Sequence, residues 1–394
     1  AASGTLAQII PPSLVLIVMA DQLGRSVGDM YQGALLPGLI LTSMYVGYVV
    51  LVAIFRPSHV PAMPPEARTL SEPDGASGLR SLALLTLAAV TGAWLFASEV
   101  YRADAPRDEV VVVSAMVGIG IAFVIAMINR LFGIGLLSRM AERVTFVLIP
   151  PLGLIFLVLG TIFIGVATPT EGGAMGALGA VLMALARRRL SLPLLKQAMD
   201  STTKLSCFVL FILIGSSVFG LTFRGVDGDL WVEHLMTSLP GGQTGFLIAV
   251  NVLVFVLAFF LDYFELAFII VPLLAPVADK LGIDLIWFGV LLAVNMQTSF
   301  LHPPFGFALF FLRSVASEKV KTASIYWGAV PFVIIQLIMV GLIIAFPGLV
   351  SYGDAGAKPA QQQELDLEQL LQGGGGAAPA GDSSSDLMRQ LQGN

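Results

Sequence analysis

The sequence predicts an all-α, polytopic membrane protein whose helices are interrupted at two matching positions. Of its 394 residues, 56% are hydrophobic and only 12% are charged, and the mean hydropathy is +0.88. A soluble fold does not need so much apolar surface, so we expect helices that cross a bilayer. Two proline pairs, Pro11-Pro12 and Pro303-Pro304, interrupt apolar stretches near opposite ends of the chain. Proline removes a backbone donor and clashes with the preceding turn, and helices broken in both halves are typical of the midplane site of a secondary transporter.

The first half of the chain contains apolar segments of spanning length, joined by short polar loops. We expect a broken helix at 5–20, in which the proline pair forms the break. Residues 56–79 are polar and rich in proline, which indicates a loop. The other helices of this half are expected at about 34–55, 80–100, 110–130, 145–167, 170–186 and 204–223.

The second half ends, as the first begins, with a broken helix and one further span. Segments 244–261 and 263–280 are separated only by a polar tip around Asp262. A broken helix is expected at 284–317 and a last helix at 325–347. The remaining residues, 351–394, are rich in Gln, Gly, Ser and Asp, which indicates a disordered tail.

Positive charges orient these helices, because cytoplasmic loops carry an excess of lysine and arginine. If the run at 187–189 is cytoplasmic, helix 204–223 runs outward and the C-terminal tail is periplasmic. Segments 244–261 and 263–280 form either two full spans or one re-entrant hairpin. In both interpretations the chain returns to the same side of the membrane, so the orientation of the later helices is unchanged. Glu265 and two prolines in the second segment favour the hairpin, which avoids contact with lipid.

The stretch from Asn295 to Pro304 holds the densest group of polar candidates. Unwound backbone there would present carbonyl oxygens, and Thr298 and Ser299 add hydroxyls, which are the ligands that hard cations such as sodium take. The half-helix that begins near Pro304 would direct its positive end at the break, which suits an anionic substrate. The equivalent place in the first half runs from Ser3 to Ser13. A proline pair can instead merely kink a helix, but two pairs in register favour a site.

Three other polar groups have both a functional and a structural interpretation. Asp262 is interpreted as the tip of a hairpin that closes over the site, with an ordinary loop between two spans as the alternative. Thr168 and Glu171 match a capping box, which is the structural interpretation, and a functional role for Glu171 is the additional one. His302 could titrate near physiological pH, although a histidine before a proline is more often a structural donor.

The composition argues against several classes of function. The single cysteine, Cys207, allows no internal disulfide, and three scattered histidines do not form a zinc motif, so no transition metal or other cofactor is expected. No basic patch indicates nucleic-acid binding. A membrane-embedded enzyme is disfavoured because the sequence shows no nucleophile–base pair and no intramembrane His–Asp set.

Several motifs together resemble the large membrane subunit (DctM-like permease) of tripartite ATP-independent periplasmic (TRAP) transporters. The stretch from Gly4 to Ser13 looks like the family's Gly-Thr-Leu-Gly-x-x-Ile-Pro-Pro-Ser segment, and residues 168–171 look like its Thr-Pro-Thr-Glu segment. The resemblance covers about 1–55 and 145–347. Its other motifs are Ser26-Val27-Gly28, Gly33 to Gly38, Phe260-Leu261-Asp262, Pro272, Pro276, Gly282-Ile283-Asp284, Trp287-Phe288-Gly289 and Pro303 to Gly306.

The resemblance implies an elevator-type secondary transporter with inverted repeats, driven by a sodium gradient, in the bacterial inner membrane. Such subunits work with a small four-helix membrane subunit and a periplasmic substrate-binding protein that delivers an organic acid. Carried over by motif, the sodium and substrate ligands would be Ser3, Gly4, Thr5, Ile9, Pro11, Asp262, Asn295, Thr298, Ser299, Leu301 and His302.

The resemblance also divides the chain and exposes departures from the family. The hairpin of the first repeat is expected upstream of Ala1, which implies an N-terminal truncation, and His302 stands where many members have threonine. The inserted helices resemble a subgroup named for mannitol or chloroaromatic compounds, a label that establishes no substrate. The expected parts are the end of the first repeat at 1–55, a cytoplasmic loop at 56–79, the inserted pair and its connection at 80–144, the second repeat at 145–350 with a hairpin at 244–280 and a broken helix at 284–317, and the tail at 351–394.

Other functions remain alternatives at this point. A sodium–carboxylate carrier of elevator architecture, working without a binding protein, is the nearest one. A channel or a membrane scaffold without transport activity is another. The sequence does not name the substrate, the sodium stoichiometry or the oligomeric state.

Overall fold

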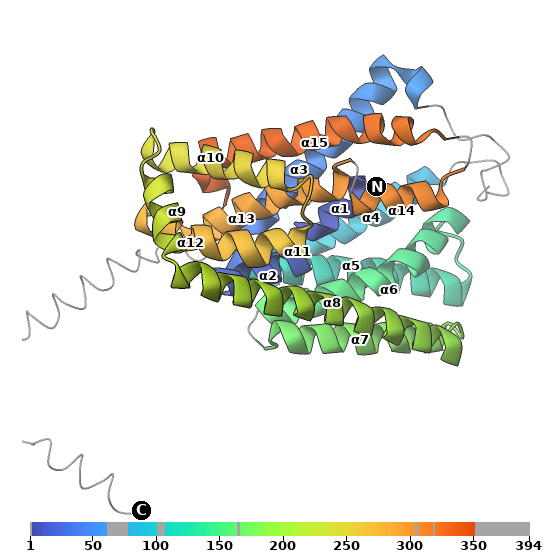
Figure 1. The fold of residues 1–394 in the computed structure, drawn as a ribbon. Coiled ribbons are helices and arrows are strands. Elements are labelled where there is room, and N and C mark those ends of the chain that lie inside the picture. Colours follow the sequence, from blue (N-terminus) through green and yellow to red (C-terminus); the bar gives the residue numbers. More distant parts are fainter. Residues whose placement is uncertain are drawn as a thin grey trace, which may run out of the picture. The chain divides into compact units, whose positions relative to one another are not determined.

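The described residues of the computed structural model are helical throughout their regular structure and contain no strand (Figure 1). Six of their helices are long and apolar enough to cross a membrane, and a seventh span results if two helices joined by a 120° bend count as one. The predicted all-α, polytopic class is therefore confirmed. The proline-rich stretch at 61–77 and the tail expected to be disordered lie outside the described residues. The structure describes residues 2–60, 78–100, 107–163, 166–303, 306–317 and 320–350.

The first proline pair separates two short helices, and a long span follows. α1 (Ala2–Thr5) continues into the 3₁₀ turn η1 (Leu6–Gln8), and α2 (Leu14–Gln22) begins only after the pair. α3 (Val27–Phe55) starts well before the expected residue 34. Its start is fixed by Ser26, whose hydroxyl accepts a hydrogen bond from the Asp29 N–H at 3.4 Å.

Four helices follow in the middle of the chain. α4 (Leu79–Leu95) ends in a π-helical turn, η4 (Phe96–Val100). It packs against α5 (Arg107–Phe132) and α6 (Arg139–Phe163), and α7 (Pro169–Ala186) packs mainly on α6.

Another proline pair in an apolar stretch, Pro150-Pro151, lies inside α6 and does not end the helix. Its neighbours, Ile149 and Leu152, carry no polar side chain that could bind the freed backbone groups. The pairs that do break helices have Ser13 and His302 beside them. A proline pair alone therefore does not produce a break in this chain.

α8 (Leu192–Gly225) and α9 (Gly228–Thr237) differ from the expectation. The expected start of α8 at residue 204 was wrong. Ser191 caps the helix by accepting from the Leu194 N–H at 3.3 Å, and the polar residues of the first turns obscured this beginning. No helix was expected at 228–237, because that stretch is short and mixes apolar with charged residues.

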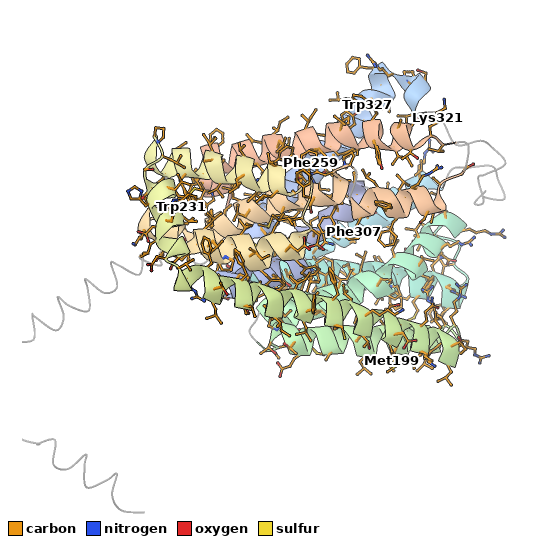
Figure 2. All side chains as sticks on the ribbon, in the orientation of Figure 1. Met199, Trp231, Phe259, Phe307, Lys321 and Trp327 are labelled. Carbon is orange, nitrogen blue, oxygen red and sulfur yellow. The ribbon has the colours of Figure 1, made fainter. Side chains whose placement is uncertain are left out.

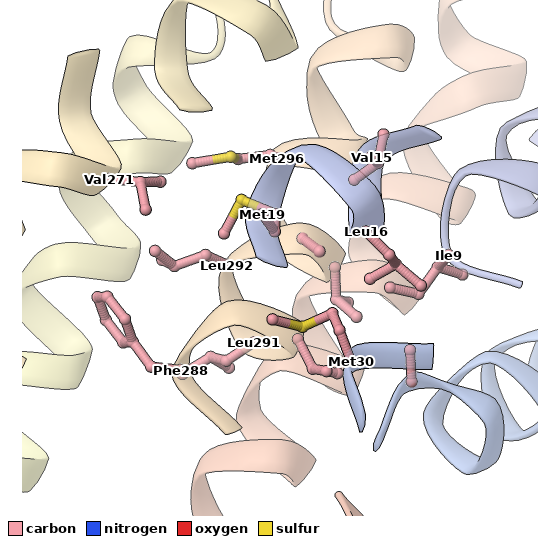
Figure 3. Close-up of a cluster of buried hydrophobic side chains, with 14 of the residues drawn as sticks. Ile9, Val15, Leu16, Met19, Met30, Val271, Phe288, Leu291, Leu292 and Met296 are labelled. Carbon is pink, nitrogen blue, oxygen red and sulfur yellow. The ribbon is translucent and has the colours of Figure 1, made fainter. Parts of the chain in front are cut away.

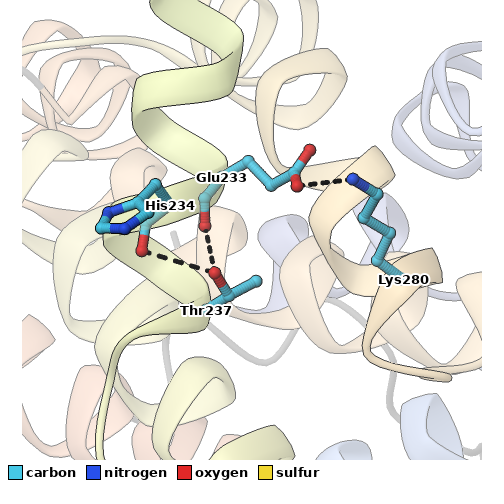
Figure 4. A network of polar contacts seen from close by, with 4 residues as sticks. All are labelled: Glu233, His234, Thr237 and Lys280. Atoms are coloured by element: carbon cyan, nitrogen blue, oxygen red, sulfur yellow. Dashed lines mark hydrogen bonds and ion pairs between the residues drawn. The ribbon is translucent and has the colours of Figure 1, made fainter.

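The segment with the polar tip forms two helical arms, and a hydrogen bond links the ends of the arms that lie away from the tip. α10 (Gly242–Leu257) is one arm, and the other consists of α11 (Tyr263–Glu265), the π-helical η5 (Leu266–Ile270) and α12 (Val271–Lys280). The Gln243 side chain donates to the Leu281 carbonyl at 2.6 Å, which brings the two ends together. Lys280 forms an ion pair with Glu233, so α9 is attached to α12 (Figure 4).

The final elements surround a buried central helix. α13 (Leu285–Met296) leads into the 3₁₀ turn η6 (Gln297–Leu301) and, after the second break, α14 (Phe307–Val315). α15 (Thr322–Ala345) and the turn η7 (Pro347–Leu349) follow.

Every residue of α13 except Trp287 is buried, because α2, α3, α10, α12 and α15 all pack on it. Phe288, Leu291 and Leu292 lie among Met19, Met30 and Val271 in this core (Figure 3). By contrast, apolar side chains project outward from many other helices, as expected for surfaces that face lipid (Figure 2). α13 is thus a fixed centre for both broken helices.

Candidate functional site

The first break is held together by Ser13. Its hydroxyl donates to the Gln8 carbonyl before the proline pair and accepts from the Leu16 N–H at 3.2 Å after it. The Tyr31 hydroxyl of α3 donates to the Ser13 carbonyl at 3.3 Å. Pro11 and Pro12, joined by a cis peptide bond, supply no backbone donor of their own. The break is therefore an ordered structure in which carbonyl groups have partners.

The second break is compact, and its backbone turns tightly. The Gly306 N–H donates to the His302 carbonyl at 2.6 Å. A Cβ atom on Gly306 would lie 2.8 Å from the carbonyl oxygens of both Phe300 and His302, so only glycine fits there. Two carbonyl oxygens consequently lie close together where the helix is interrupted.

His302 connects this break with the polar-tip arm. Its ring stacks on Phe259, with centroids 4.0 Å apart, and meets Phe255 edge-on at 4.7 Å. The side chain is buried, and neither ring nitrogen makes a well-aligned hydrogen bond among the described residues, although the Ala258 backbone is a neighbour of the ring. The aromatic contacts thus position His302, and its nitrogen atoms face protein rather than solvent.

The two breaks meet, although they are almost 300 residues apart in sequence. The Gln297 amide of η6 donates to the Thr5 hydroxyl at 3.2 Å, and both side chains are buried. Packing follows a crossed pattern: α1 contacts α14, and α2 contacts α13. Each broken helix therefore packs its first half against the second half of the other, an arrangement that inverted repeats would produce.

Buried polar atoms without partners gather around this meeting point. The Gln297 and Asn295 side-chain oxygens make no hydrogen bond among the described residues. The Tyr45 hydroxyl and the Gln336 amide make no well-aligned one, although the Tyr45 hydroxyl interacts with Thr5 and Gln336. These groups come from α1, α3, α13, α15 and η6. An unpaired buried polar group is costly, which makes this cluster a candidate ligand set.

Asn295 and Thr298 extend the cluster toward α10. The Asn295 amide donates to the carbonyl and side-chain oxygens of Asn251, at 2.8 and 2.9 Å. The Thr298 hydroxyl donates to the Asn295 carbonyl at 2.7 Å. Since a hydroxyl oxygen also has acceptor capacity, Thr298 can still bind a cation.

The polar tip contacts the first break through tyrosine rather than through Asp262. Asp262 caps α11 by accepting from the Glu265 N–H at 3.1 Å, and Glu265 in turn accepts from the Asp262 N–H at 3.1 Å. The buried Tyr263 hydroxyl donates to the Val15 carbonyl of α2. The Asp262-x-x-Glu265 spacing could have indicated this capping box from the sequence.

A cavity of about 500 Å³ lies beside the meeting point. Thr5 and Gln8 provide its polar lining, and Phe307 and Ala308 at the first turn of α14 also line it. Its remaining lining is Gly4, Phe300, Phe311, Leu312 and Val315. A mostly apolar cavity of this size with a few polar groups is typical of a small-molecule site.

The structure brings some of the sequence-predicted residues together and separates others. Thr5 and Asn295 to Ser299 are buried around the meeting point, as is His302. Ser3 and Gly4 are exposed on α1, and Gly4 lines the cavity. Ile9 and Leu301 place their side chains in apolar clusters, so only their backbone oxygens could be ligands, and buried Pro11 likewise offers only its carbonyl.

Thr168 and Glu171 form the predicted capping box at the start of α7. The Glu171 carboxylate accepts from the Thr168 N–H at 2.8 Å, and the Thr168 hydroxyl accepts from the Glu171 N–H at 3.3 Å. α7 packs mainly on α6 rather than on the broken helices. Their geometry therefore supports the structural role.

Sequence reasoning missed Gln336, Tyr45, Asn251 and Tyr263, and it included Gln297 in the polar stretch from Asn295 to Pro304 without singling it out as a ligand. A signal existed for two of them, since Gln336 and Asn251 are isolated amides within apolar helices, where polar residues are expensive. The others became visible only when segments distant in sequence were placed side by side.

Comparison with known proteins identifies the family. The family model described as "Tripartite ATP-independent periplasmic transporter, DctM component" matches residues 1–349. The chain belongs to this family. It is 23% identical over 348 residues to the C4-dicarboxylate TRAP transporter large permease protein DctM of Pseudomonas aeruginosa, covering 88% of this chain and 64% of that protein.

Two further relatives carry other substrate names. The ectoine TRAP transporter large permease protein TeaC of Halomonas elongata is 24% identical over 355 residues, covering 89% of this chain and 65% of the relative. The sialic acid TRAP transporter permease protein SiaT of Haemophilus influenzae is 28% identical over 197 residues, covering 50% and 32%. The chain thus spans between about a third and just under two thirds of the length of these three relatives.

The geometry of the second break predicts a selective effect of adding one methyl group. Gly306→Ala should destabilise the protein by about 1–3 kcal/mol, because the new Cβ displaces two carbonyl oxygens. Gly341→Ala on α15 is the control, since nothing lies within 4 Å of its Cβ. Thermal unfolding in detergent measures both. Equal melting temperatures for the two variants would contradict the tight turn at Gly306.

Proposed function

We propose that this chain is the large membrane subunit through which a small organic acid enters a bacterial cell, coupled to the entry of sodium. The observation that carries the proposal is the cluster of unpaired buried polar atoms where the two helix breaks meet. Because the chain belongs to a transporter family, we interpret this cluster as a binding site for the transported ions and substrate. A polar cluster between two broken helices provides a place where ions and substrate can be bound away from lipid.

Sodium would be held by oxygen atoms near the second break. The candidates are the side-chain oxygens of Asn295 and Gln297, the hydroxyls of Thr298 and Ser299, and the carbonyl oxygens of Phe300 to His302. Hard cations prefer such ligands. Thr5 would contribute from the first break, through its contact with Gln297.

The substrate would occupy the cavity beside the meeting point. The first turn of α14 begins there, and the positive end of a helix favours a carboxylate. Relatives named for C4-dicarboxylates and for sialic acid support the class of organic acids. Because the named substrates differ among relatives, they do not select one acid for this chain.

The family description supports a proposal for the remaining parts of the system. A periplasmic binding protein would deliver the substrate, and a small four-helix membrane subunit would complete the permease in the inner membrane. The arms α10 and α11–α12 would form a re-entrant hairpin in an elevator-type transport domain, and the C-terminal tail would be periplasmic. The contact from Tyr263 to Val15 would couple this hairpin to the first break.

Uptake in vesicles tests the proposal. The complete system, reconstituted with its binding protein, should accumulate substrate only while an inward sodium gradient exists. Uptake that persists after the gradient is collapsed would exclude sodium coupling. Uptake without the binding protein would instead support a carrier that works alone, and ionic current without either would support a channel.

Loss of two hydroxyls at the second break should lower the apparent affinity of the transporter for sodium. Thr298→Ala with Ser299→Ala should raise the sodium concentration for half-maximal uptake by roughly tenfold, because charge-assisted contacts are lost. Ser314→Ala on α14 is the matched control, since its exposed hydroxyl only bonds the Phe311 carbonyl at 2.8 Å. An unchanged sodium dependence in the double variant would remove both residues from the site.

A further inference from the structure

A second cavity, of about 680 Å³, lies far along the chain from the breaks, between α5, α6 and α7. Four arginines line it, together with a single acidic residue, Glu142, and the apolar residues Phe123, Phe146, Val147, Pro150 and Ala186. The arginines are Arg130, Arg139, Arg143 and Arg187. No sodium or substrate role accounts for such a concentration of guanidinium groups.

Three helix ends bring the arginines together. Arg130 lies in the last turn of α5, and Arg139 and Arg143 lie in the first turns of α6. Arg187 is the C-cap of α7. The close packing of α5 on α6, and of α6 on α7, places these ends around one cavity.

Asn129, which is only 5% exposed, fixes the turn between α5 and α6. Its side-chain oxygen accepts from the Leu136 and Leu137 N–H groups at 2.8 and 3.2 Å. Its amide donates to the Glu142 carboxylate at 2.6 Å. The one carboxylate of the cavity is therefore held in place by a buried partner.

Two of the arginines are positioned by Phe146. The Arg187 guanidinium donates to the Phe146 carbonyl, and the Arg130 guanidinium lies 5.1 Å from the centre of the Phe146 ring. A guanidinium group has five N–H donors, so each retains donors for an anion. Positioned arginines form the geometry in which phosphate oxygens are bound.

The surroundings of the cavity are apolar and exposed. Val147 in its lining is 50% exposed, and neighbouring Leu148 is 52% exposed. At the end of α5, Leu131 and Phe132 are 74% and 76% exposed. A ligand at this place would meet guanidinium groups at one end and apolar helix faces alongside.

We propose that this cavity binds the phosphate headgroup of an anionic phospholipid, with the acyl chains along the exposed faces of α5 and α6. Basic pockets between membrane helices near the cytoplasmic side bind such headgroups. A soluble phosphate would use the arginines but not the adjoining apolar surface. The helix α5 lies in the segment that the sequence predicts to be inserted between the two halves, and the proposal gives this segment a function as part of a lipid site.

Native mass spectrometry of the purified chain tests the proposal, with phosphatidylglycerol and phosphatidylethanolamine of identical acyl chains as probes. The wild-type chain should retain the anionic lipid at least tenfold better. The triple variant Arg130→Gln, Arg143→Gln and Arg187→Gln should bind it on the order of 100-fold more weakly, since each arginine near an anionic headgroup contributes about 1 kcal/mol.

The control variant removes the same charge elsewhere, through Arg25→Gln, Arg56→Gln and Arg224→Gln, three exposed arginines near the ends of other helices that do not line the cavity. It should bind like the wild type, and an equal loss in both variants would overturn the proposal. Equal retention of the two lipids by the wild type would also overturn it. If glycerol phosphate displaces the lipid at millimolar concentration, the site binds soluble phosphates instead. That competition uses the wild-type chain, so it decides the question even if the triple variant does not fold.

Discussion

The structure depends on one constraint: a helix that is interrupted inside a membrane must satisfy its backbone groups from within the protein. Ser13 does this at the first break by bonding backbone groups on both sides of the prolines. At the second break, the chain closes on itself through the Gly306 N–H and the His302 carbonyl. Both solutions require neighbouring helices that exclude lipid, which explains why α13 is buried almost completely.

Bringing the breaks together has a chemical consequence. Thr5 and Gln297 share a hydrogen bond, but the side chains around them present more acceptors and donors than the described protein groups satisfy. Under the proposed function, a bound cation would remove the cost of the unpaired acceptor oxygens. The hairpin-like arms touch both breaks, through Tyr263 at the first and His302 at the second. A movement of these arms would therefore alter both breaks at once.

Much of the fold followed from the sequence, because apolar length and helix breakers act locally. Thr168 and the proline pairs predicted element ends that the structure contains. The start of α8 and the whole of α9 were missed, because charged residues such as Lys196 and Glu233 hid helices that are stabilised by caps and tertiary packing. Pro150-Pro151 shows the converse, since the same dipeptide lies within an uninterrupted helix.

The candidate site was harder to predict than the fold. Thr298 and Asn295 were found because they adjoin a break. Gln336 and Tyr45 lie in the middle of ordinary spans, and their relevance depends on which helix faces are opposed. The carboxylate of Asp262 is a group that often binds cations, yet in this structure it caps α11. Residue type and spacing indicate capacity for binding, whereas the partners of a side chain are decided by tertiary packing.

Cysteine cross-linking tests most directly whether the two breaks meet. With Cys207→Ser as the background, Thr5→Cys and Gln297→Cys place thiols on two residues whose side chains touch, since the Gln297 Nε2 and Thr5 Oγ1 atoms are 3.2 Å apart. Because cysteine is shorter than the glutamine it replaces, a short bis-methanethiosulfonate reagent is used to bridge the two thiols. In membranes it should join them within one chain, so that fragments cut between the helices stay linked until reduction. A pair that the reagent leaves unlinked, while Asn251→Cys with Asn295→Cys is linked, would contradict a shared site at the two breaks.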